Sequence, residues 1–460
     1  MSSSLAAPAT HLVGFGPFCR KFGLQYSWSR KCRARNAAMK SPITLSLVVL
    51  CLLLAWTPGA NAQPVEPVID PSAAAGDYFV LSERDSGYWV SAEALMWKRS
   101  NSGSSGPIIG GPESFRFGND AFHYEGGYRL GAGWLIDSNY EVEGIWTQFN
   151  GWNSGNSGVL LHAISYDDGQ ADPLVDPMSD GNFVNTTTFF RPLYDAATDD
   201  LGGPPNPNDE TIEFEFMQPG STYTLQRSSK LSDGQVNFKT RRTQGRRFSL
   251  GLGYRHISLT EAAQVGITGT FDAFDVDGDE AGVNDSNDQL SGEALTAHGL
   301  AGAGSFNDPS LAGGAFTMLW NGASSNQMNG LQGVLDGSIF ERGRFALDGN
   351  VRAGVFLNRA HGSIVERYSQ VGGAVYGRSF ADEADRASFA GSIGLSGSVR
   401  LAERFHFRTG YEVMFVTNVG MAPSQQQGIT YDALGNASYS VQTGDSIILQ
   451  GLRVGFDYQW

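Results

Sequence analysis

The segment Ile448–Trp460 reads ILQGLRVGFDYQW and alternates between two kinds of residue. One face carries leucine, valine and then Phe456, Tyr458 and Trp460, whereas glycine, arginine, aspartate and glutamine occupy the other face. Successive side chains of a β-strand point to opposite faces, so this segment predicts a strand between an apolar and a polar surrounding. A strand that ends on aromatic residues is typical of the interface girdle of an outer-membrane β-barrel. A strand of a soluble β-domain is the alternative.

The N-terminal region predicts export from the cytoplasm. Ile43–Trp56 reads ITLSLVVLCLLLAW, which has the length of a secretory apolar region and is short for a membrane-spanning helix. An A-x-A cleavage signal follows at 60–62. We therefore predict a signal peptide over 1–62 with an alternative start at Met39, a flexible lead-in over 63–86, and a barrel over 87–460.

Cysteine usage and charge exclude several functions for the predicted mature chain. Cys19, Cys32 and Cys51 all precede residue 63, so that chain has no disulfide framework, thiol nucleophile or thiolate metal site. The predicted leader carries seven basic residues and no acidic ones, so its removal makes the formal net charge of −15 more negative by seven. Such an acidic chain is not expected to bind nucleic acid.

Strand-like segments recur along the chain, and long and short connections alternate between them. This alternation predicts an all-β, transmembrane, up-and-down antiparallel β-barrel with short periplasmic turns and long external loops in the outer membrane. A hairpin formed by 211–217 and 221–225 would raise the strand number from ten to twelve. The ten predicted strands are 88–97, 127–136, 140–149, 231–242, 247–261, 326–340, 344–358, 388–401, 404–418 and 447–460.

The faces of these strands place charged residues inside the barrel. A charged side chain that faces lipid at mid-depth costs roughly 2–4 kcal/mol, so we expect the charges to point inward. Ten strands predict a narrow interior, in which opposite charges form ion-pair networks; a pore lining that selects solutes is the alternative. The pore-lining candidates are Glu141, Glu143, Arg255, Asp348, Arg352, Arg400, Arg408, Glu412, Arg453 and Asp457, and Arg129, Lys239, Arg241 and Asp336 share the inward face.

Several short motifs resemble a planctomycete-type family of secreted outer-membrane β-barrel porins. They are YWVSAEALMW at Tyr88–Trp97, GYRHI at Gly253–Ile257, GLQG at Gly330–Gly333, and GLRVG at Gly451–Gly455. The resemblance spans residues 87 to 460 and implies an outer-membrane barrel with an assumed porin role. It also implies that the terminal aromatic residues Phe456, Tyr458 and Trp460 form the signal read by the barrel-assembly machinery.

The sequence contains candidates for two further kinds of site. The cluster Asp275, Asp277, Asp279 and Glu280 offers hard oxygen ligands for calcium, but its glycine spacing departs from the EF-hand pattern, so a solvated acidic loop is the simpler interpretation. No cofactor is otherwise expected. The histidines lie in no recognisable catalytic motif, and His162, near two aspartates, is the rim position to test. The sequence therefore predicts a protein that is not an enzyme.

The expected function is passive. We expect a narrow pore or a structural surface barrel that contacts outer-membrane lipid and the barrel-assembly machinery. The alternative is a surface interaction or adhesion protein that binds an extracellular ligand through long acidic loops at about 151–229 and 262–325.

Overall fold

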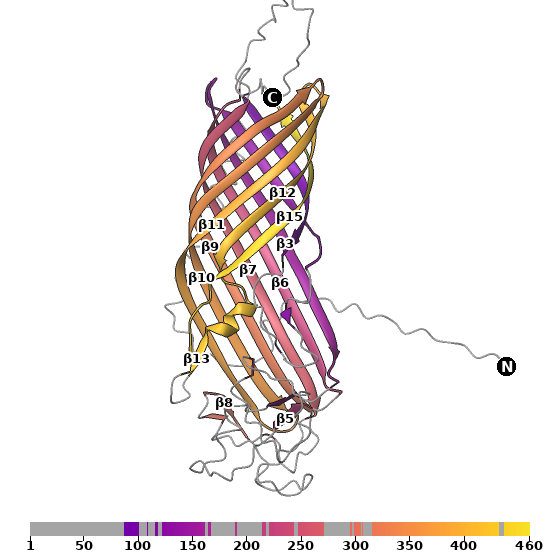
Figure 1. Cartoon of the computed structure of the whole chain (residues 1–460), viewed down its shortest axis with the longest axis vertical. Helices are drawn as coiled ribbons and strands as arrows, with labels where there is room; N and C mark the ends of the chain where they lie inside the picture. Colours follow the sequence, from indigo (N-terminus) through magenta and orange to yellow (C-terminus); the bar gives the residue numbers. More distant parts are fainter. Residues whose placement is uncertain are drawn as a thin grey trace, which may run out of the picture. The chain divides into compact units, whose positions relative to one another are not determined.

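Ten antiparallel strands form the barrel of this protein (Figure 1). The computed structural model describes residues 87–460 apart from 101–107, 109–115, 118–121, 162–163, 167–188, 191–213, 218–219, 243–246, 271–294, 297–298, 305, 307–314 and 432–436. The barrel strands are β1 (Tyr88–Arg99), β2 (Glu125–Leu135), β3 (Tyr140–Val159), β6 (Thr222–Thr240), β7 (Phe248–Thr270), β9 (Ala315–Arg342), β10 (Phe345–Gln370), β11 (Val375–Ala402), β12 (Phe405–Val419) and β15 (Asp445–Gln459).

The last strand closes the barrel against the first. β15 pairs with β1 in a register that places Gln459 opposite Trp89, and every other neighbour in the barrel also pairs antiparallel. The predicted ten-stranded barrel is therefore confirmed. The twelve-stranded alternative is wrong: β5 (Phe214–Met217) pairs with the short β4 (Ile164–Tyr166) outside the barrel, and residues 222–225 belong to β6. Among the described residues, no helix is long and apolar enough to cross a membrane.

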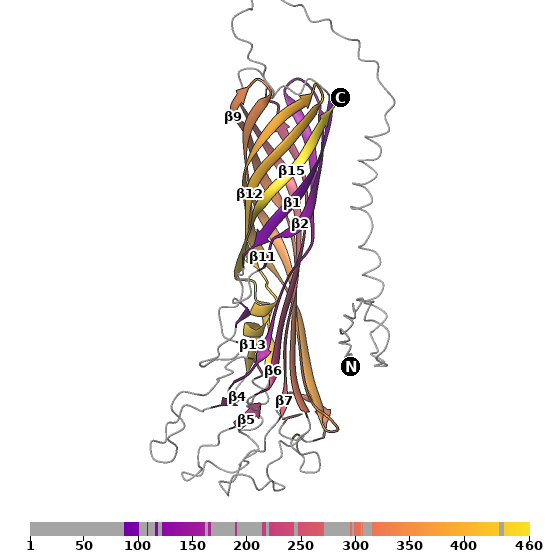
Figure 2. The same ribbon diagram turned by 90° about the vertical axis from the view of Figure 1, so that its right-hand side faces the viewer.

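The two ends of the barrel differ. The short connections at 136–139, 343–344 and 403–404 lie at one end, together with Trp460 and with the described residues 241–242 and 247, and we call this the turn end. The ring of Trp460 stacks on Tyr88 with 6.0 Å between the ring centroids. At the opposite, loop end, β3, β6, β7, β9, β10 and β11 continue past the ends of β1, β2 and β12 (Figure 2). We call these continuations the extension.

An apolar belt surrounds the barrel on the side of the turn end. Its outward side chains are exposed although they are large and apolar, which is the pattern of a surface that faces lipid hydrocarbon. Aromatic residues lie at its edge on the turn end. The belt includes Val90, Met96, Tyr128, Leu130, Trp134, Tyr140, Val236, Phe238, Phe248, Leu250, Leu252, Tyr254, Leu331, Leu335, Phe345, Val351, Val355, Leu357, Phe389, Ile393, Leu395, Tyr411, Leu452, Val454, Phe456, Tyr458 and Trp460.

The polarity of the two faces reverses along each long strand. On β7 the outward residues run from Leu252 and Tyr254 in the belt to Ser258 and Thr260 in the extension, whereas the inward residues change from Arg255 to Ile257. Water therefore surrounds the extension, and apolar side chains fill its inner side. Parts of the two predicted long loops are strand for this reason: 151–159, 222–229, 262–270 and 315–325 lie within barrel strands.

A layer of apolar side chains crosses the barrel at the loop-end edge of the belt. We call it the apolar plug, and nine of the ten barrel strands contribute to it. On the remaining strand, β2, Gly127 leaves room for the ring of Phe149, because a Cβ at Gly127 would lie 2.6 Å from Cδ1 of that ring. The plug comprises Leu95, Trp97, Phe122, Phe149, Trp152, Leu231, Ile257, Leu259, Met328, Phe356, Ala390, Met414, Val416, Val419, Met421, Ile447 and Leu449.

A second apolar cluster, the external core, fills the inner side of the extension, and it includes Phe117, Phe189, Val265, Trp320 and Tyr368. The connection of residues 420–444 between β12 and β15, which we call the strap, covers part of this core. The strap contains the 3-10 helix η3 (Pro423–Gly428) and the hairpin of β13 (Ile429–Tyr431) and β14 (Ala437–Tyr439) (Figure 1). Five of the six η3 residues are buried.

Hydrogen bonds hold the strap to the long strands. Asn326 on β9 bonds both backbone groups of Gly420: its Oδ1 accepts from the amide and its Nδ2 donates to the carbonyl, each at 2.8 Å. The indole Nε1 of Trp320 donates to Oε1 of Gln426 at 2.5 Å. The strap therefore closes the barrel over the apolar plug.

Candidate functional site

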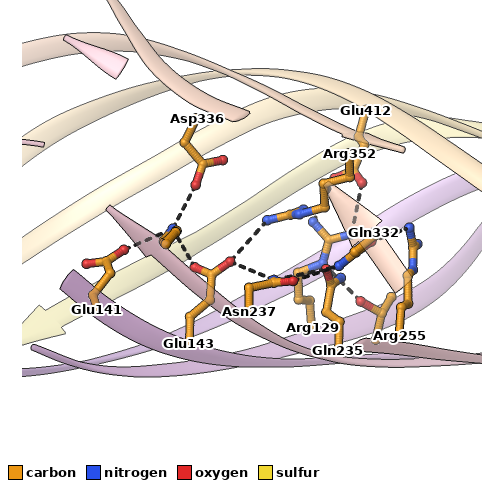
Figure 3. Close-up of polar contacts among 12 residues, drawn as sticks. Arg129, Glu141, Glu143, Gln235, Asn237, Arg255, Gln332, Asp336, Arg352 and Glu412 are labelled. Carbon is orange, nitrogen blue, oxygen red and sulfur yellow. Dashed lines mark hydrogen bonds and ion pairs between the residues drawn. The ribbon is translucent and has the colours of Figure 1, made fainter. Parts of the chain in front are cut away.

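The lumen inside the apolar belt holds a network of ion pairs, shown in Figure 3. On one side of the lumen, Lys239 of β6 lies among three carboxylates. Its Nζ is 3.0 Å from Oε1 of Glu141, 2.7 Å from Oε2 of Glu143 and 2.7 Å from Oδ2 of Asp336. Glu141 and Glu143 share the inward face of β3, because alternate residues of a strand point the same way. One ammonium group therefore joins β3, β6 and β9.

Amide side chains extend this cluster along the lumen. Asn237 donates to Oε1 of Glu143 at 2.9 Å, and Gln332 donates to Oδ1 of Asn237 at 2.8 Å and to Oε1 of Gln235 at 2.9 Å (Figure 3). Next to them, Arg255 of β7 forms two parallel hydrogen bonds of 2.8 Å. The acceptor of both is the carboxylate of Asp233 on β6. This planar bidentate pair has the geometry in which arginine holds a carboxylate most firmly.

A second group of charges joins strands on the other side of the barrel. Arg129 of β2 donates to both oxygens of Glu412 on β12, at 2.7 and 3.3 Å, and to Thr147 at 3.0 Å. Arg453 lies 3.7 Å from Glu412 and 3.8 Å from Glu93. Each of these four charged side chains is at most 6% exposed. Buried charges persist only when they are paired and hydrogen-bonded, as they are here.

The network leaves little open space. The cavity between the ion pairs, lined by residues that include Glu93, Lys239, Arg352 and Arg408, has a volume of about 70 Å³. A cavity of that size has room for a few water molecules. The apolar plug lies directly beyond it, since Ile257 and Leu259 follow Arg255 on the inward face of β7. Two different closures are thus stacked along the lumen.

The structure places all ten pore-lining candidates inside the barrel. Nine of them take part in ion pairs, and Arg400 is half-buried without an ion pair to any described residue. Arg352 lies 3.8 Å from Glu143. Arg242, which follows Lys239 at the turn end, pairs with Asp348 at 2.8 Å.

Three charged members of these ion pairs were missed by the sequence reasoning: Asp233, Glu93 and Arg242, which pairs with Asp348 although its neighbour Arg241 was predicted to point inward. Asp233 has the same strand parity as Lys239, so the alternation of β6 already indicated its inward position. Glu93 was harder to find, because Trp89, Leu95 and Trp97 also point inward on β1 and apolar residues therefore occupy both faces of that strand.

A separate buried ion group lies beyond the belt, between the apolar plug and the external core. Oε1 of Glu261 on β7 accepts from Arg99 at 2.9 Å and from Arg227 at 2.8 Å, and its Oε2 accepts from the amide of Ala422 in the strap at 3.0 Å. Burial alone would raise the pKa of Glu261, but the two guanidinium groups outweigh it and hold the pKa below its ordinary value. Both guanidinium groups also lie over the ring of Phe122, 4.6 and 4.9 Å from its centroid.

The remaining predicted sites lie elsewhere. The weak calcium candidates Asp275, Asp277, Asp279 and Glu280 fall outside the described residues, as does His162. Among the side chains that the structure describes, no three of His, Cys, Asp and Glu come together in a way that could hold a metal ion.

Comparison with known proteins gives similarity at the level of the fold. No family model and no curated protein matches the chain. The outer-membrane protease OmpT of Escherichia coli is similar with 9% identity and a TM-score of 0.34, over 81% of this chain and 97% of that chain. The Pseudomonas putida toluene transporter TodX has 9% identity and a TM-score of 0.23, over 81% of this chain and 90% of that chain. A Pseudomonas aeruginosa FadL homologue has 10% identity and a TM-score of 0.25, over 81% and 90%.

The fold of an outer-membrane β-barrel rests on the closed sheet of ten antiparallel strands and its apolar belt, because TM-scores of 0.34 or less carry no argument. The resemblance to the planctomycete-type porin family is not confirmed by these similarities. The prediction that the chain is not an enzyme is corrected, because a protease stands among the barrels to which it is similar. At such low identity that likeness assigns no activity to this chain.

Proposed function

We propose that this protein is an integral outer-membrane barrel with a closed lumen, which anchors a folded extension at the cell surface for contact with partners. The observation that carries the proposal is the pair of stacked closures. The cavity between the ion pairs has a volume of about 70 Å³, and the apolar plug joins nine strands across the barrel immediately beyond it. A solute would have to displace both layers to pass.

The extension supports the second half of the proposal. It has its own apolar core, and the strap and the ion group around Glu261 fasten that core to the barrel. A structure that served only to cross the membrane would not need strands that continue well past the belt. Folded material on the loop end is therefore the part with which surroundings make contact.

The same geometry supports our proposal for the membrane contacts. The apolar belt faces lipid, the turn end faces the periplasm, and the extension faces outward. Phe456, Tyr458 and Trp460 are exposed on the outward face of β15, where the barrel-assembly machinery would read them before closure. The rings of Tyr458 and Trp460 pack against one another with 5.8 Å between their centroids, and the ring of Phe456 stacks on Phe405 with 5.1 Å between their centroids.

Accessibility of single cysteines tests this arrangement. Cys19, Cys32 and Cys51 are replaced by serine, and one cysteine is placed either at His361, which is exposed on the outward face of the β10 extension, or at Ser392, which is buried in the lumen. A membrane-impermeant maleimide should label His361→Cys on intact cells and should label Ser392→Cys only after denaturation. Equal labelling of the two variants would contradict a closed lumen, and an unlabelled His361→Cys would contradict surface exposure.

A narrow pore is the second candidate function. One observation favours it: most residues that line the cavity in the network are charged or polar, including Ser91, Ser396 and Arg408, although Trp89 and Ile145 also line it. Solute would then diffuse past the arginine and carboxylate side chains once the strap and the plug had moved. Conductance separates the two candidates.

A further inference from the structure

A groove crosses the outward face of the extension and has a volume of about 940 Å³. Two rows of outward residues from five neighbouring strands line it, and the strand register aligns them. The first row is Asn153, Ser228, Ala262, Ala323 and Ser363, and the second row is Gly155, Gln226, Gln264, Asn321 and Val365. Figure 2 shows the long strands curving beyond the barrel.

The two rows have different shapes and chemistry. Small side chains such as Ala262 and Ala323 form the floor, and the carboxamides of Gln226, Gln264 and Asn321 stand in line beside it. No charged side chain lies in either row. Arg227 is also among the lining residues, but its guanidinium turns inward to Glu261, 2.8 Å away. His123 also lines the groove, and apart from that imidazole the groove presents no ionisable side chain, in a chain whose formal net charge is −15.

The three carboxamides differ from the other polar side chains on the same face. On the belt side, Gln327 donates to Ser258 at 2.9 Å and Tyr254 donates to Asn329 at 2.7 Å. On the other side, Thr268 bonds Thr317 at 3.1 Å. Polar neighbours therefore pair across strands on both sides of the groove. Within the described residues, Gln226, Gln264 and Asn321 make no such bond although they lie directly opposite one another.

We infer that this groove binds a linear, neutral, polyhydroxylated chain, that is, a segment of an extracellular polysaccharide. Carboxamides both donate and accept hydrogen bonds, which suits hydroxyl groups of either polarity. Strands spaced by about 4.8 Å give five strands a width of about 19 Å, which an extended chain can span. The volume lies within the range of ligand sites.

The position of the groove favours a chain in the surroundings over the headgroup of a lipid in the same membrane. Ala262 lies eight residues beyond Tyr254, the last belt residue on β7, which corresponds to roughly 26 Å along the strand. This inference deepens the proposed surface function and rests on it for the outward exposure of the extension.

Binding of defined oligosaccharides to the folded full-length chain in detergent tests the inference. The probes are maltohexaose, cellohexaose and a β-1,3-linked glucose hexamer, followed by saturation-transfer NMR and calorimetry. At least one neutral hexamer should bind. Gln264→Ala and Asn321→Ala should each weaken that binding about tenfold, since each removes hydrogen bonds to a buried part of the ligand.

Two further variants make the result specific to the groove. Ala323→Trp should abolish binding, because its exposed outward position lets the indole fill the floor without entering the external core. Gln327→Ala, an outward carboxamide outside the groove, should change the affinity less than twofold. Absence of binding to all three hexamers, or binding that survives Ala323→Trp, would overturn the inference. A closed lumen is measured separately by cysteine labelling, so failure of one proposal is distinguishable from failure of the other.

Discussion

Nη1 of Arg129 lies 2.7 Å from Oε2 of Glu412 across the barrel lumen, although 283 residues separate them in the chain. The side chains are 6% and 2% exposed. Arg453 approaches the same carboxylate, so Glu412 balances two cations on β2 and β15. Removal of one partner of a buried pair leaves an uncompensated charge, which is why this contact has consequences for folding.

Glu412→Ala should lower the stability of the folded barrel by about 3–5 kcal/mol, because Arg129 and Arg453 lose their shared carboxylate. The measurement is the temperature at which the heat-modifiable folded band disappears on a denaturing gel. Glu383→Ala, at an exposed outward position of β11, is the control and should leave that temperature nearly unchanged. The double variant Arg129→Met with Glu412→Met should recover most of the loss; equal temperatures for Glu412→Ala and the unaltered protein would contradict the account.

Lys239→Met should destabilise the barrel more than a comparable change at the surface. Three carboxylates within 3.0 Å of Nζ would lose their cation and repel one another in a buried place. Arg359→Met is the matched control, because its 3.5 Å pair with Asp385 is more than half exposed, and such pairs contribute about 0–1 kcal/mol. In denaturant titrations read by tryptophan fluorescence, Lys239→Met should unfold at a clearly lower denaturant concentration than Arg359→Met. A lower unfolding midpoint for Arg359→Met would count against a structural role for the network.

Asp445→Asn should stabilise the protein at neutral pH. Burial and the nearby Glu261 carboxylate raise the pKa of Asp445, which lies at the loop end of β15 beyond the belt. The pKa of Asp445 is therefore higher in the folded state than in the unfolded state, where it is about 3.9. The protonated group stabilises the fold at pH values below about 3.9, and this stabilisation is lost as the pH rises through the folded-state pKa. Asparagine mimics the neutral form, so the melting temperature should rise at pH 7 and change little near pH 3. Asp385→Asn, at an exposed position, should show no such pH-dependent gain.

Gln426→Ala should loosen the strap, since it leaves the buried Nε1 of Trp320 without its acceptor at a cost of about 1–3 kcal/mol. Hydrogen exchange over residues 420–431 should accelerate, while exchange within β15 stays slow. The neighbouring Gln427→Ala offers a matched control, because Gln427 is exposed. Equal exchange rates in the two variants would show that this hydrogen bond does not hold the strap.

Much of the barrel follows from alternation in the sequence. Outward rows such as Phe456, Tyr458 and Trp460 are apolar because lipid surrounds them, and this periodicity identified all ten strands. The same alternation predicts that Arg129 and Glu412 point inward. It does not predict their contact, because the stagger between β2 and β12 around the closed barrel decides which inward residues meet.

Most of the extension was predicted as loop because its polarity is the reverse of that in the belt. Outward residues such as Gln264 give no membrane signal, and Val265 and Ile267 point inward to a core that water does not reach. A search for apolar residues on the outward face therefore ended the strands too early. The same reversal concealed the groove, which depends on register across five strands rather than on any motif in one of them.

Planar-bilayer recording of the refolded wild-type protein tests the closed lumen most directly. A band that shifts on heating must first show that the barrel is folded in the sample used. The account predicts no stepwise conductance from the folded protein, because the ion-pair network and the apolar plug lie in series. Regular conductance steps that change when Arg408 is replaced by glutamine would contradict it and would establish a pore.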